Sequence, residues 1–333
     1  MNASMWLKAL RVIPRIEKSE WDTLDIISRW LISTRAAVLI MTFISAALAG
    51  IFAWRDGGFH FGRWALLVVG LIFAHATNNL INDLTDYKRG VDKNNYFRTQ
   101  YGPQPLQQGL LTIRSLLVYI AVTGLIAVAA GVPLVVQGGS TALWLMVAGV
   151  AFVLFYTFPL KYIGMGEIAV LIIWGPLMVG GGYFVITGAW DWNVVWASLT
   201  YALGPTTVLF GKHIDKLVAD EAKKIYTMPV ILGEKAARYT VMGMIAIQYL
   251  TVIALVMTGF FTPVMLVVLA ALTAIPRVWA IYKNPKPENC PPDYDPSIWP
   301  LWFSAISFYH NRRYGMFLML GLMLEVVMRL WIL

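Results

Sequence analysis

Long hydrophobic stretches, separated by polar connections, make up most of the sequence. A helix that crosses a bilayer needs about 20 mostly apolar residues, and nine stretches meet this requirement. They are residues 30–54, 64–83, 113–135, 141–159, 165–187, 193–211, 238–258, 262–282 and 313–333. The pattern predicts an all-α integral membrane protein with nine transmembrane helices.

The connections between these stretches differ in length and charge. Those at 84–112, 212–237 and 283–312 are long and polar, whereas the other connections are short. The N-terminal segment, the long connections with their flanks and Lys161 hold 22 of the 26 Lys and Arg residues. Because cytoplasmic loops are enriched in Lys and Arg, this asymmetry predicts that the N-terminus and the long loops face the cytoplasm.

Composition agrees with a membrane protein. Hydrophobic residues make up 59% of the 333 residues and charged residues 13%, against about 25% charged in soluble domains. This excludes an ordinary soluble enzyme, a disordered chain and a coiled coil. The net charge of +8 is explained by the cytoplasmic loops, so no nucleic acid partner is expected. Cys290 is the sole cysteine and cannot form an intramolecular disulfide.

The chain is expected to form one membrane domain over residues 1–333, because no soluble module is long enough to stand alone. Residues 1–20 carry Lys8, Arg11, Arg15 and Lys18 with apolar residues between them, which predicts that residues 1–29 form an amphipathic segment at the membrane interface. The proline-rich stretch 283–300 is predicted to be a loop, since proline ends helices.

The second hydrophobic stretch ends in a group of acidic and amide residues. Asn79, Asn82, Asp83 and Asp86 share one face of a helix by their spacing, and Asp92 follows after Gly90. Carboxylates at the mouth of a membrane helix are costly unless something compensates their charge. Mg²⁺ does so through oxygen ligands and is typically shared with substrate phosphates. The alternative is a solvated helix end.

The sixth stretch ends in a second charged group. It contains Lys212, His213, Asp215 and Asp220. Two facing carboxylate sets would hold Mg²⁺ ions around a diphosphate. A five-residue step rotates about 500°, so Asp215 and Asp220 would not share a face of a regular helix. Either the helix breaks before Asp220, or Asp215 is not a metal ligand.

These two motifs resemble those of the UbiA superfamily of intramembrane prenyltransferases. The resemblance rests on Asn79–Asp86 with Asp92, and on Asp215–Asp220 followed by Thr227–Gly233. The spacing between Asp86 and Asp92 most resembles that in one branch of the superfamily. The enzymes of this branch prenylate 1,4-dihydroxy-2-naphthoate in menaquinone biosynthesis. The five-residue step to Asp220 and the Lys223-Lys224 pair after it depart from the family pattern.

The resemblance implies helices around a central cavity, an isoprenyl diphosphate donor, a small aromatic acceptor such as a naphthoate or a phenol, and a Mg²⁺ cofactor. Residues 84–112 and 212–237 would be the cytoplasmic active-site loops. The implied metal ligands are Asn79, Asp83, Asp86, Asp92, Asp215 and Asp220, of which the four residues Asp83, Asp86, Asp215 and Asp220 would be catalytic. The implied substrate-binding residues are Arg35, Asn79, Asn82, Arg98, Tyr156, Lys161 and Lys212.

Two other functions remain open at this point. A UbiA-type terpene cyclase would use the same fold and donor without an acceptor, and the altered second motif is compatible with it. A cation-coupled transporter is the third reading, but transporter sites usually lie near the midplane of the membrane within repeats. Here the carboxylates lie at one face and no repeat is found.

Several isolated polar residues also lie in or beside the apolar stretches. Arg35 is expected either in the active-site cavity or snorkelling to the interface. His75 is expected to be a satisfied core histidine, and Glu325 is expected to pair with Arg329 four residues later. Glu167 is expected in the cavity or at the interface, and His213 is a weaker candidate for a phosphate contact.

Overall fold

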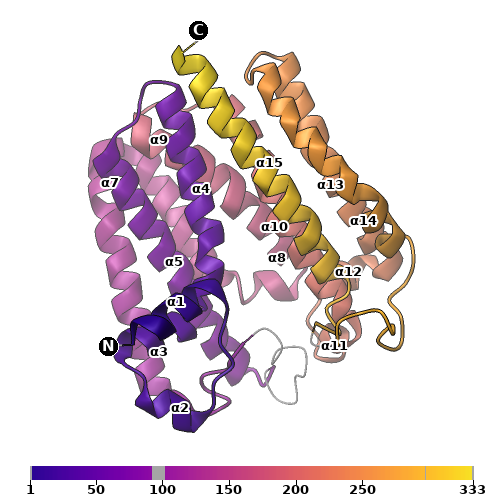
Figure 1. The fold of residues 1–333 in the computed structure, drawn as a ribbon. Coiled ribbons are helices and arrows are strands. Elements are labelled where there is room, and N and C mark those ends of the chain that lie inside the picture. Colours follow the sequence, from indigo (N-terminus) through magenta and orange to yellow (C-terminus); the bar gives the residue numbers. More distant parts are fainter. Residues whose placement is uncertain (1, 92–101, 297, 332–333) are drawn as a thin grey trace. The chain divides into compact units, whose positions relative to one another are not determined.

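The computed structural model describes residues 2–91, 102–296 and 298–331. Over these residues the chain is helical, and the described part contains no β-strand beyond an isolated bridge between Ile163 and Tyr226. The chain divides into two units, which Figure 1 shows with their helices labelled. Unit 1 comprises Met1–Ala47 and His60–Pro159, and unit 2 comprises Leu48–Phe59 and Leu160–Leu333.

Unit 1 is built on two long helices that pack against each other, α5 and α7. Its helices are α1 (Ala3–Arg11), α2 (Lys18–Thr23), α3 (Ile26–Ser33), the first part of α4 (Ala36–Arg55), α5 (Phe61–Lys88) and α7 (Ile113–Phe155). Gly139 interrupts α7 with a non-helical backbone (φ 64°, ψ −148°). A positive φ is accessible to glycine at little cost, so α7 consists of two helices joined at the predicted connection 136–140.

Unit 2 surrounds one mostly buried helix, α10, which packs against α8, η2, α13 and α15. Its elements after the end of α4 are η1 (Leu160–Tyr162), α8 (Gly166–Ile172), η2 (Ile173–Gly180), α9 (Gly181–Thr187), α10 (Trp192–Asp215), α11 (Leu217–Ala222), α12 (Met228–Leu232), α13 (Glu234–Met257), η3 (Pro263–Ala274), α14 (Ile275–Tyr282) and α15 (Phe303–Trp331). No helix is formed in the described part of the proline-rich stretch 283–300, as predicted.

Seven of the described helices are long and apolar enough to cross a membrane, so the predicted count of nine is not confirmed. The prediction of one continuous helix over 30–54 is wrong, because α3 ends at Ser33 and α4 begins at Ala36. Arg35 lies at this junction with a φ of 55°, which a helix does not accommodate. The second predicted helix extends further than expected, to Lys88, so Asp86 is a helical residue.

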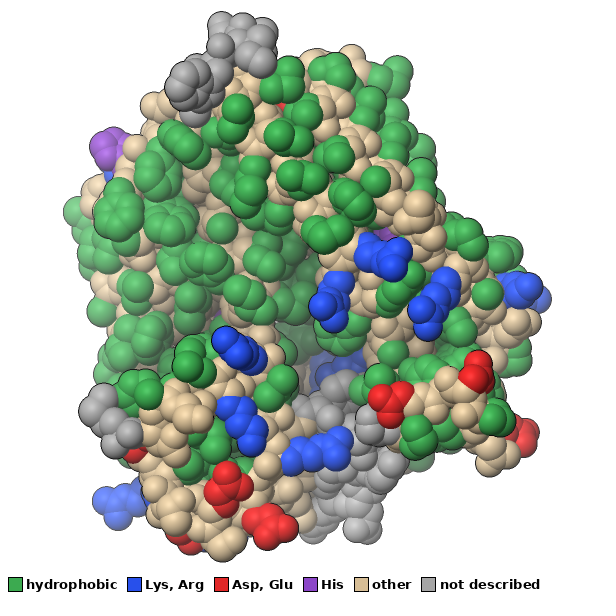
Figure 2. Space-filling view, viewed as in Figure 1, with side chains coloured by type: hydrophobic (Ala, Val, Ile, Leu, Met, Phe, Trp, Pro, Cys, Tyr) green, Lys and Arg blue, Asp and Glu red, His purple; other side chains and the backbone are tan. Residues whose placement is uncertain are grey.

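Large hydrophobic side chains are exposed along several helices. On α7 they include Leu125, Val136 and Trp144. Figure 2 shows hydrophobic side chains over most of the visible helix surfaces, with charged side chains gathered in separate groups. Monomeric soluble proteins rarely expose such large apolar patches, so these surfaces suit lipid contact.

Asp25 fixes the N-terminal segment within unit 1. Its carboxylate accepts hydrogen bonds from the N–H groups of Ile27 (3.0 Å) and Ser28 (3.1 Å), which caps the N-terminus of α3. It also accepts from the Asn2 N–H (2.9 Å) and from the Trp6 indole (3.1 Å) beside and within α1. Partial burial raises the pKa of Asp25, but these donors and the Ser28 hydroxyl outweigh it and hold the pKa well below its usual range.

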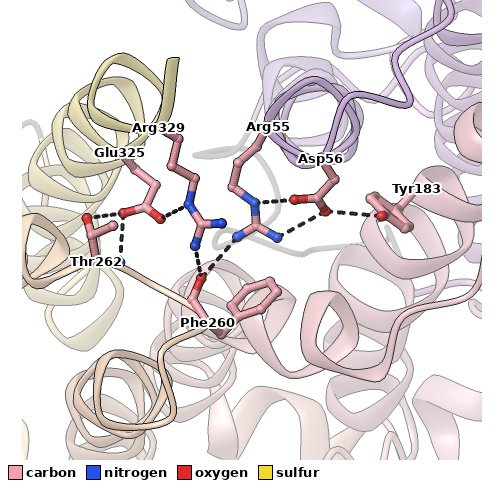
Figure 3. Close-up of polar contacts among 7 residues, drawn as sticks. All are labelled: Arg55, Asp56, Tyr183, Phe260, Thr262, Glu325 and Arg329. Carbon is pink, nitrogen blue, oxygen red and sulfur yellow. Dashed lines mark hydrogen bonds and ion pairs between the residues drawn. The ribbon is translucent and has the colours of Figure 1, made fainter. Parts of the chain in front are cut away.

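A polar network links α4, α9 and the connection before η3 in unit 2 (Figure 3). Arg55 donates to the Asp56 carboxylate at 2.7 and 3.1 Å and to the Phe260 carbonyl at 3.4 Å. The Tyr183 hydroxyl donates at 3.0 Å to Oδ2 of Asp56, one of the two oxygens that also accept from Arg55. The Arg55 guanidinium also lies 4.1 Å from the centre of the Phe260 ring. Arg55 is therefore neutralised within the protein.

The second half of this network holds the C-terminal part of α15. Arg329 donates to the Glu325 carboxylate at 2.9 Å, as the four-residue spacing predicted, and to the Phe260 carbonyl at 2.8 Å. The Glu325 side chain is fully buried, and its other oxygen accepts from the N–H and the hydroxyl of Thr262. Figure 3 shows both arginines converging on the same Phe260 carbonyl.

Replacing Arg329 is expected to destabilise unit 2. The substitution Arg329→Met leaves the buried Glu325 carboxylate with Thr262 as its remaining partner in the network, and should lower the free energy of unfolding by about 2 kcal/mol. Unfolding in detergent by denaturant measures the change. Arg312→Met, on the exposed surface of the same helix, is the matched control. Equal stabilities of the two variants would contradict the role of this network.

Replacing Asp25 is expected to release α1. Asp25→Ala removes the acceptor shared by α1 and α3, so trypsin should cut at Arg11 and Arg15 faster than in the unaltered protein. Asp22→Ala is the control, since Asp22 pairs with Lys18 on the surface. Because the pKa of Asp25 is lowered, its stabilisation is present above about pH 4 and is lost as the pH falls through the folded-state pKa. Unchanged cleavage would refute this anchor.

Candidate active site

The first acidic motif forms a buried face on the last turns of α5 in unit 1. Asp83 and Asp86 are each only 2% exposed, and their three-residue spacing places them on the same side of the helix as Asn79. The sequence predicted this common face. Carboxylates buried to this degree need compensating donors or cations, so the face is suited to charge binding rather than to packing.

Arg35 provides one compensating charge. Its guanidinium donates to the Asp83 carboxylate at 2.5 Å and to the Asn79 carbonyl at 2.9 Å. The left-handed backbone of Arg35 between α3 and α4 is a strained conformation for a residue other than glycine. Of the two expectations for Arg35, these contacts favour a place at the acidic motif over snorkelling to the interface.

The amide side chains of the motif are held by their nitrogen atoms. The Asn79 amide donates to the Thr34 carbonyl at 2.8 Å, and the Asn82 amide donates to the Thr157 hydroxyl at 3.1 Å. The amide oxygen of Asn79 is therefore the atom with which this side chain would bind a cation. Tyr156, which directly follows α7, is half-buried and immediately precedes Thr157, the hydrogen-bond partner of Asn82.

The second acidic motif lies in unit 2 on both sides of a helix break. α10 ends at Asp215, and α11 begins at Leu217. Asp220 is buried, and one of its oxygens accepts from the Lys216 ammonium group at 2.8 Å. Its other oxygen, Oδ2, is buried and has no hydrogen-bond partner among the described residues. The break was one of the two explanations that the five-residue spacing allowed.

Asp215 has different neighbours. Its carboxylate accepts hydrogen bonds from the first backbone N–H groups of α15. The partners of Asp215 were not foreseen, because they come from Phe303 and Ser304, about 90 residues later in the chain, and no sequence spacing signals such a contact.

A histidine–glutamate pair lies beside the second motif. The His213 imidazole is hydrogen-bonded to Glu167 at 2.5 Å, and both side chains are buried. The second Glu167 oxygen accepts from the Met228 N–H at 3.3 Å, at the start of α12. The sequence singled out both residues but not their pairing. This pair joins α8, α10 and α12, and so holds the segment that carries Asp220.

Two of the basic residues predicted to bind substrate lie in unit 2. Lys161 is buried in η1, and Lys212 is half-buried in the last turn of α10. Both remain predicted substrate contacts. The other basic candidate, Arg98, and the candidate metal ligand Asp92 lie outside the described residues.

The donor atoms in both units fit magnesium. Mg²⁺ prefers oxygen and usually binds through one or two carboxylates, with water and substrate phosphates completing its shell. Asp83 and Asp86 in one unit and the buried Oδ2 of Asp220 in the other offer such oxygens. Among the described residues no three His, Cys, Asp or Glu side chains converge on one point.

Comparison with known proteins establishes the family. The UbiA prenyltransferase family model matches residues 43–308, and the chain belongs to this family. The predicted class of protein, a UbiA-type prenyltransferase enzyme, is thereby confirmed.

The curated relatives are distant. The 1,4-dihydroxy-2-naphthoate octaprenyltransferase of Bacillus subtilis is 25% identical over 267 residues, which are 77% of this chain and 83% of that protein. The enzyme of the same name from Escherichia coli is 27% identical over 221 residues, 63% of this chain and 70% of that protein. A UbiA prenyltransferase domain-containing protein 1 homolog of Drosophila melanogaster is 23% identical over 61% of this chain, which spans 56% of its length.

Solved structures share the fold. A digeranylgeranylglyceryl phosphate synthase structure superposes with a TM-score of 0.63 at 15% identity, covering 90% of this chain and 97% of the other. A UbiA homolog from Archaeoglobus fulgidus, bound to DMAPP and Mg²⁺, gives a TM-score of 0.57 at 16% identity over 87% of this chain and 99% of the other. The predicted class of fold, an all-α integral membrane protein of the UbiA type, is confirmed.

Proposed function

We propose that this chain transfers an isoprenyl group from a polyprenyl diphosphate to 1,4-dihydroxy-2-naphthoate or a related phenol, in a Mg²⁺-dependent reaction of lipid-quinone biosynthesis. The observation that carries the proposal is the buried acidic face of α5, which holds Asp83 and Asp86 and where Asp83 is paired with Arg35. The names of the bacterial relatives support the naphthoate acceptor. The family structure bound to DMAPP and Mg²⁺ supports the donor and the metal.

The metal ligands in this proposal are Asp83, Asp86 and the amide oxygen of Asn79 in the first motif, with Asp92 after it, and Asp220 in the second. Magnesium bound there would neutralise the negative charge that builds on the leaving diphosphate. Asp83 is already oriented by its bond to Arg35, and Asn79 by its bond to the Thr34 carbonyl. These contacts preorganise the oxygen atoms before the substrate arrives.

The basic residues bind the remaining phosphate charge. Arg35, Lys161 and Lys212 are the proposed diphosphate contacts within the described residues, and Arg98 and Tyr156 are further substrate contacts. The bond between C1 of the prenyl chain and the diphosphate oxygen breaks, and its electron pair leaves with the diphosphate. An electron-rich ring carbon of the acceptor then bonds to C1 and loses its proton. Basic side chains that hold the diphosphate favour this departure.

The membrane supplies the environment for this reaction. The exposed apolar helix surfaces suit lipid contact, and a prenyl chain is itself hydrocarbon. Basic residues are concentrated in the N-terminal segment and the long connections, which supports a cytoplasmic N-terminus and cytoplasmic loops over 84–112 and 212–237. We also propose that the full chain forms a single membrane domain, in which residues 1–29 lie at the membrane interface.

An assay of the purified protein tests the proposed reaction. Geranylgeranyl diphosphate and Mg²⁺ are supplied with and without 1,4-dihydroxy-2-naphthoate, and both diphosphate and the lipid product are measured. We expect diphosphate release that requires the acceptor, together with a prenylated product. Release without an acceptor and a cyclic product would replace the proposal with the terpene cyclase, and no release with any aromatic acceptor would overturn it.

Substitution in the first motif tests the acidic face. Asp83→Asn and Asp86→Asn keep the side-chain size but remove the charge, so diphosphate release should fall by about 100-fold or more. Asp22→Asn, on the exposed surface, is the matched control and should keep full activity. Activity of the two motif variants equal to that of the control would remove these residues from the metal site.

A further inference from the structure

The Asp215 carboxylate lies against the N-terminus of α15. One oxygen accepts from the Phe303 N–H at 2.8 Å, and the other accepts from both the Ser304 N–H and the Ser304 hydroxyl at 2.9 Å. The side chain is fully buried. Asp215 thus supplies the acceptor that the first orphan N–H groups of a helix require, although it lies on another helix.

A lysine of the proline-rich loop completes these contacts. The Lys286 ammonium group lies 3.9 Å from the Asp215 carboxylate and donates to the Asp215 carbonyl at 3.2 Å. The same group donates to the Pro300 carbonyl at 2.6 Å and lies 5.0 Å from the centre of the Trp299 ring. Lys286 therefore neutralises Asp215 and ties both ends of the loop to the end of α10.

The backbones of the two helices also touch at this point. One turn before Asp215, a Cβ atom on Gly211 would lie 2.7 Å from the Phe303 carbonyl oxygen and 2.8 Å from the Ser304 nitrogen. Real Cβ atoms do not approach backbone so closely, so glycine permits this contact. The position of the Asp215 carboxylate at α15 is consequently set by helix packing as well as by hydrogen bonds.

Binding a metal through Asp215 would disrupt this arrangement. A carboxylate has about four lone-pair directions, and three hydrogen bonds and a lysine charge already engage its two oxygens. A cation in their place would leave buried N–H groups without acceptors, which is unfavourable. Asp220 offers the opposite environment, since its Oδ2 atom is buried without a hydrogen-bond partner among the described residues.

We propose that Asp215 is not a metal ligand but the anchor that joins the start of α15 and the proline-rich loop to α10, and that Asp220 alone provides the metal-binding carboxylate of the second motif. The part concerning Asp220 rests on the proposed Mg²⁺-dependent function, whereas the part concerning Asp215 stands on the contacts alone. On this assignment the five-residue spacing has a reason, because the two carboxylates serve different partners.

Two readouts separate the anchor from the ligand. Mn²⁺ binding to the purified protein, followed by electron paramagnetic resonance, reports the metal site without catalysis. Thermal unfolding in detergent, with chymotrypsin cleavage in the loop 283–302, reports the anchor. Asp215→Asn is compared with Asp220→Asn, and Glu221→Gln, an exposed neighbouring carboxylate, is the matched control.

We expect Asp220→Asn to weaken Mn²⁺ binding at least tenfold while the unfolding temperature stays near that of Glu221→Gln. Asp215→Asn should lower the unfolding temperature and speed chymotrypsin cleavage, while the Mn²⁺ affinity of the folded fraction stays within about twofold. Weakened Mn²⁺ binding by Asp215→Asn at unchanged stability would overturn the proposal. If the unaltered protein shows no prenyl transfer, the proposed function is wrong. The unfolding and cleavage results then still decide whether Asp215 is the anchor.

Variants of the donors keep the test valid if Asp215→Asn does not fold. Ser304→Ala removes one hydrogen bond to Asp215, and Lys286→Met removes its counter-charge, while both leave the carboxylate in place. Each should destabilise the protein, and the double variant should lose less than the sum of the two because both act through Asp215. Stability and cleavage equal to those of the unaltered protein in both single variants would refute the anchor.

Discussion

A carboxylate buried among apolar helices is unfavourable unless donors or cations compensate its charge, and this constraint explains where the polar side chains of the protein lie. Asp83 is paired with Arg35, Glu167 with His213, and Glu325 with Arg329 and Thr262. Asp220 is likewise paired with Lys216 through one oxygen, but its other oxygen, Oδ2, is buried and accepts no hydrogen bond from a described residue. A buried acceptor of this kind is the feature expected where a cation belongs.

The two anchors of α15 show how the same constraint organises unit 2. Asp215 caps the helix at Ser304, and Glu325 fixes it 21 residues later. At a rise of 1.5 Å per residue the two contacts are about 30 Å apart, close to the thickness of the hydrocarbon core. Polar contacts therefore hold both ends of a helix whose middle can lie in the apolar layer.

The contacts at the C-terminal end of α15 also explain why some basic residues lie outside the long basic connections. Arg55 and Arg329 belong to the few basic residues that the predicted topology places away from the cytoplasm. Their charges are met by Asp56 and Glu325, and both guanidinium groups donate to the Phe260 carbonyl (Figure 3). Internally paired arginines of this kind serve packing and do not oppose the orientation that the basic residues of the long connections predict.

Hydrophobic length and helical spacing were sufficient to predict a helical membrane protein, the common face of Asp83 and Asp86, and the pairing of Glu325 with Arg329, because these properties depend on residues close together in the chain. Tertiary structure alone decided the break at Arg35, the pairing of Glu167 with His213, and the neighbours of Asp215. The spacing of Asp215 and Asp220 indicated that one helix face could not hold both. It could not indicate that Phe303, Ser304 and Lys286 engage Asp215, because contacts between residues 70 to 90 positions apart are set by helix packing, which leaves no periodic signal in the sequence.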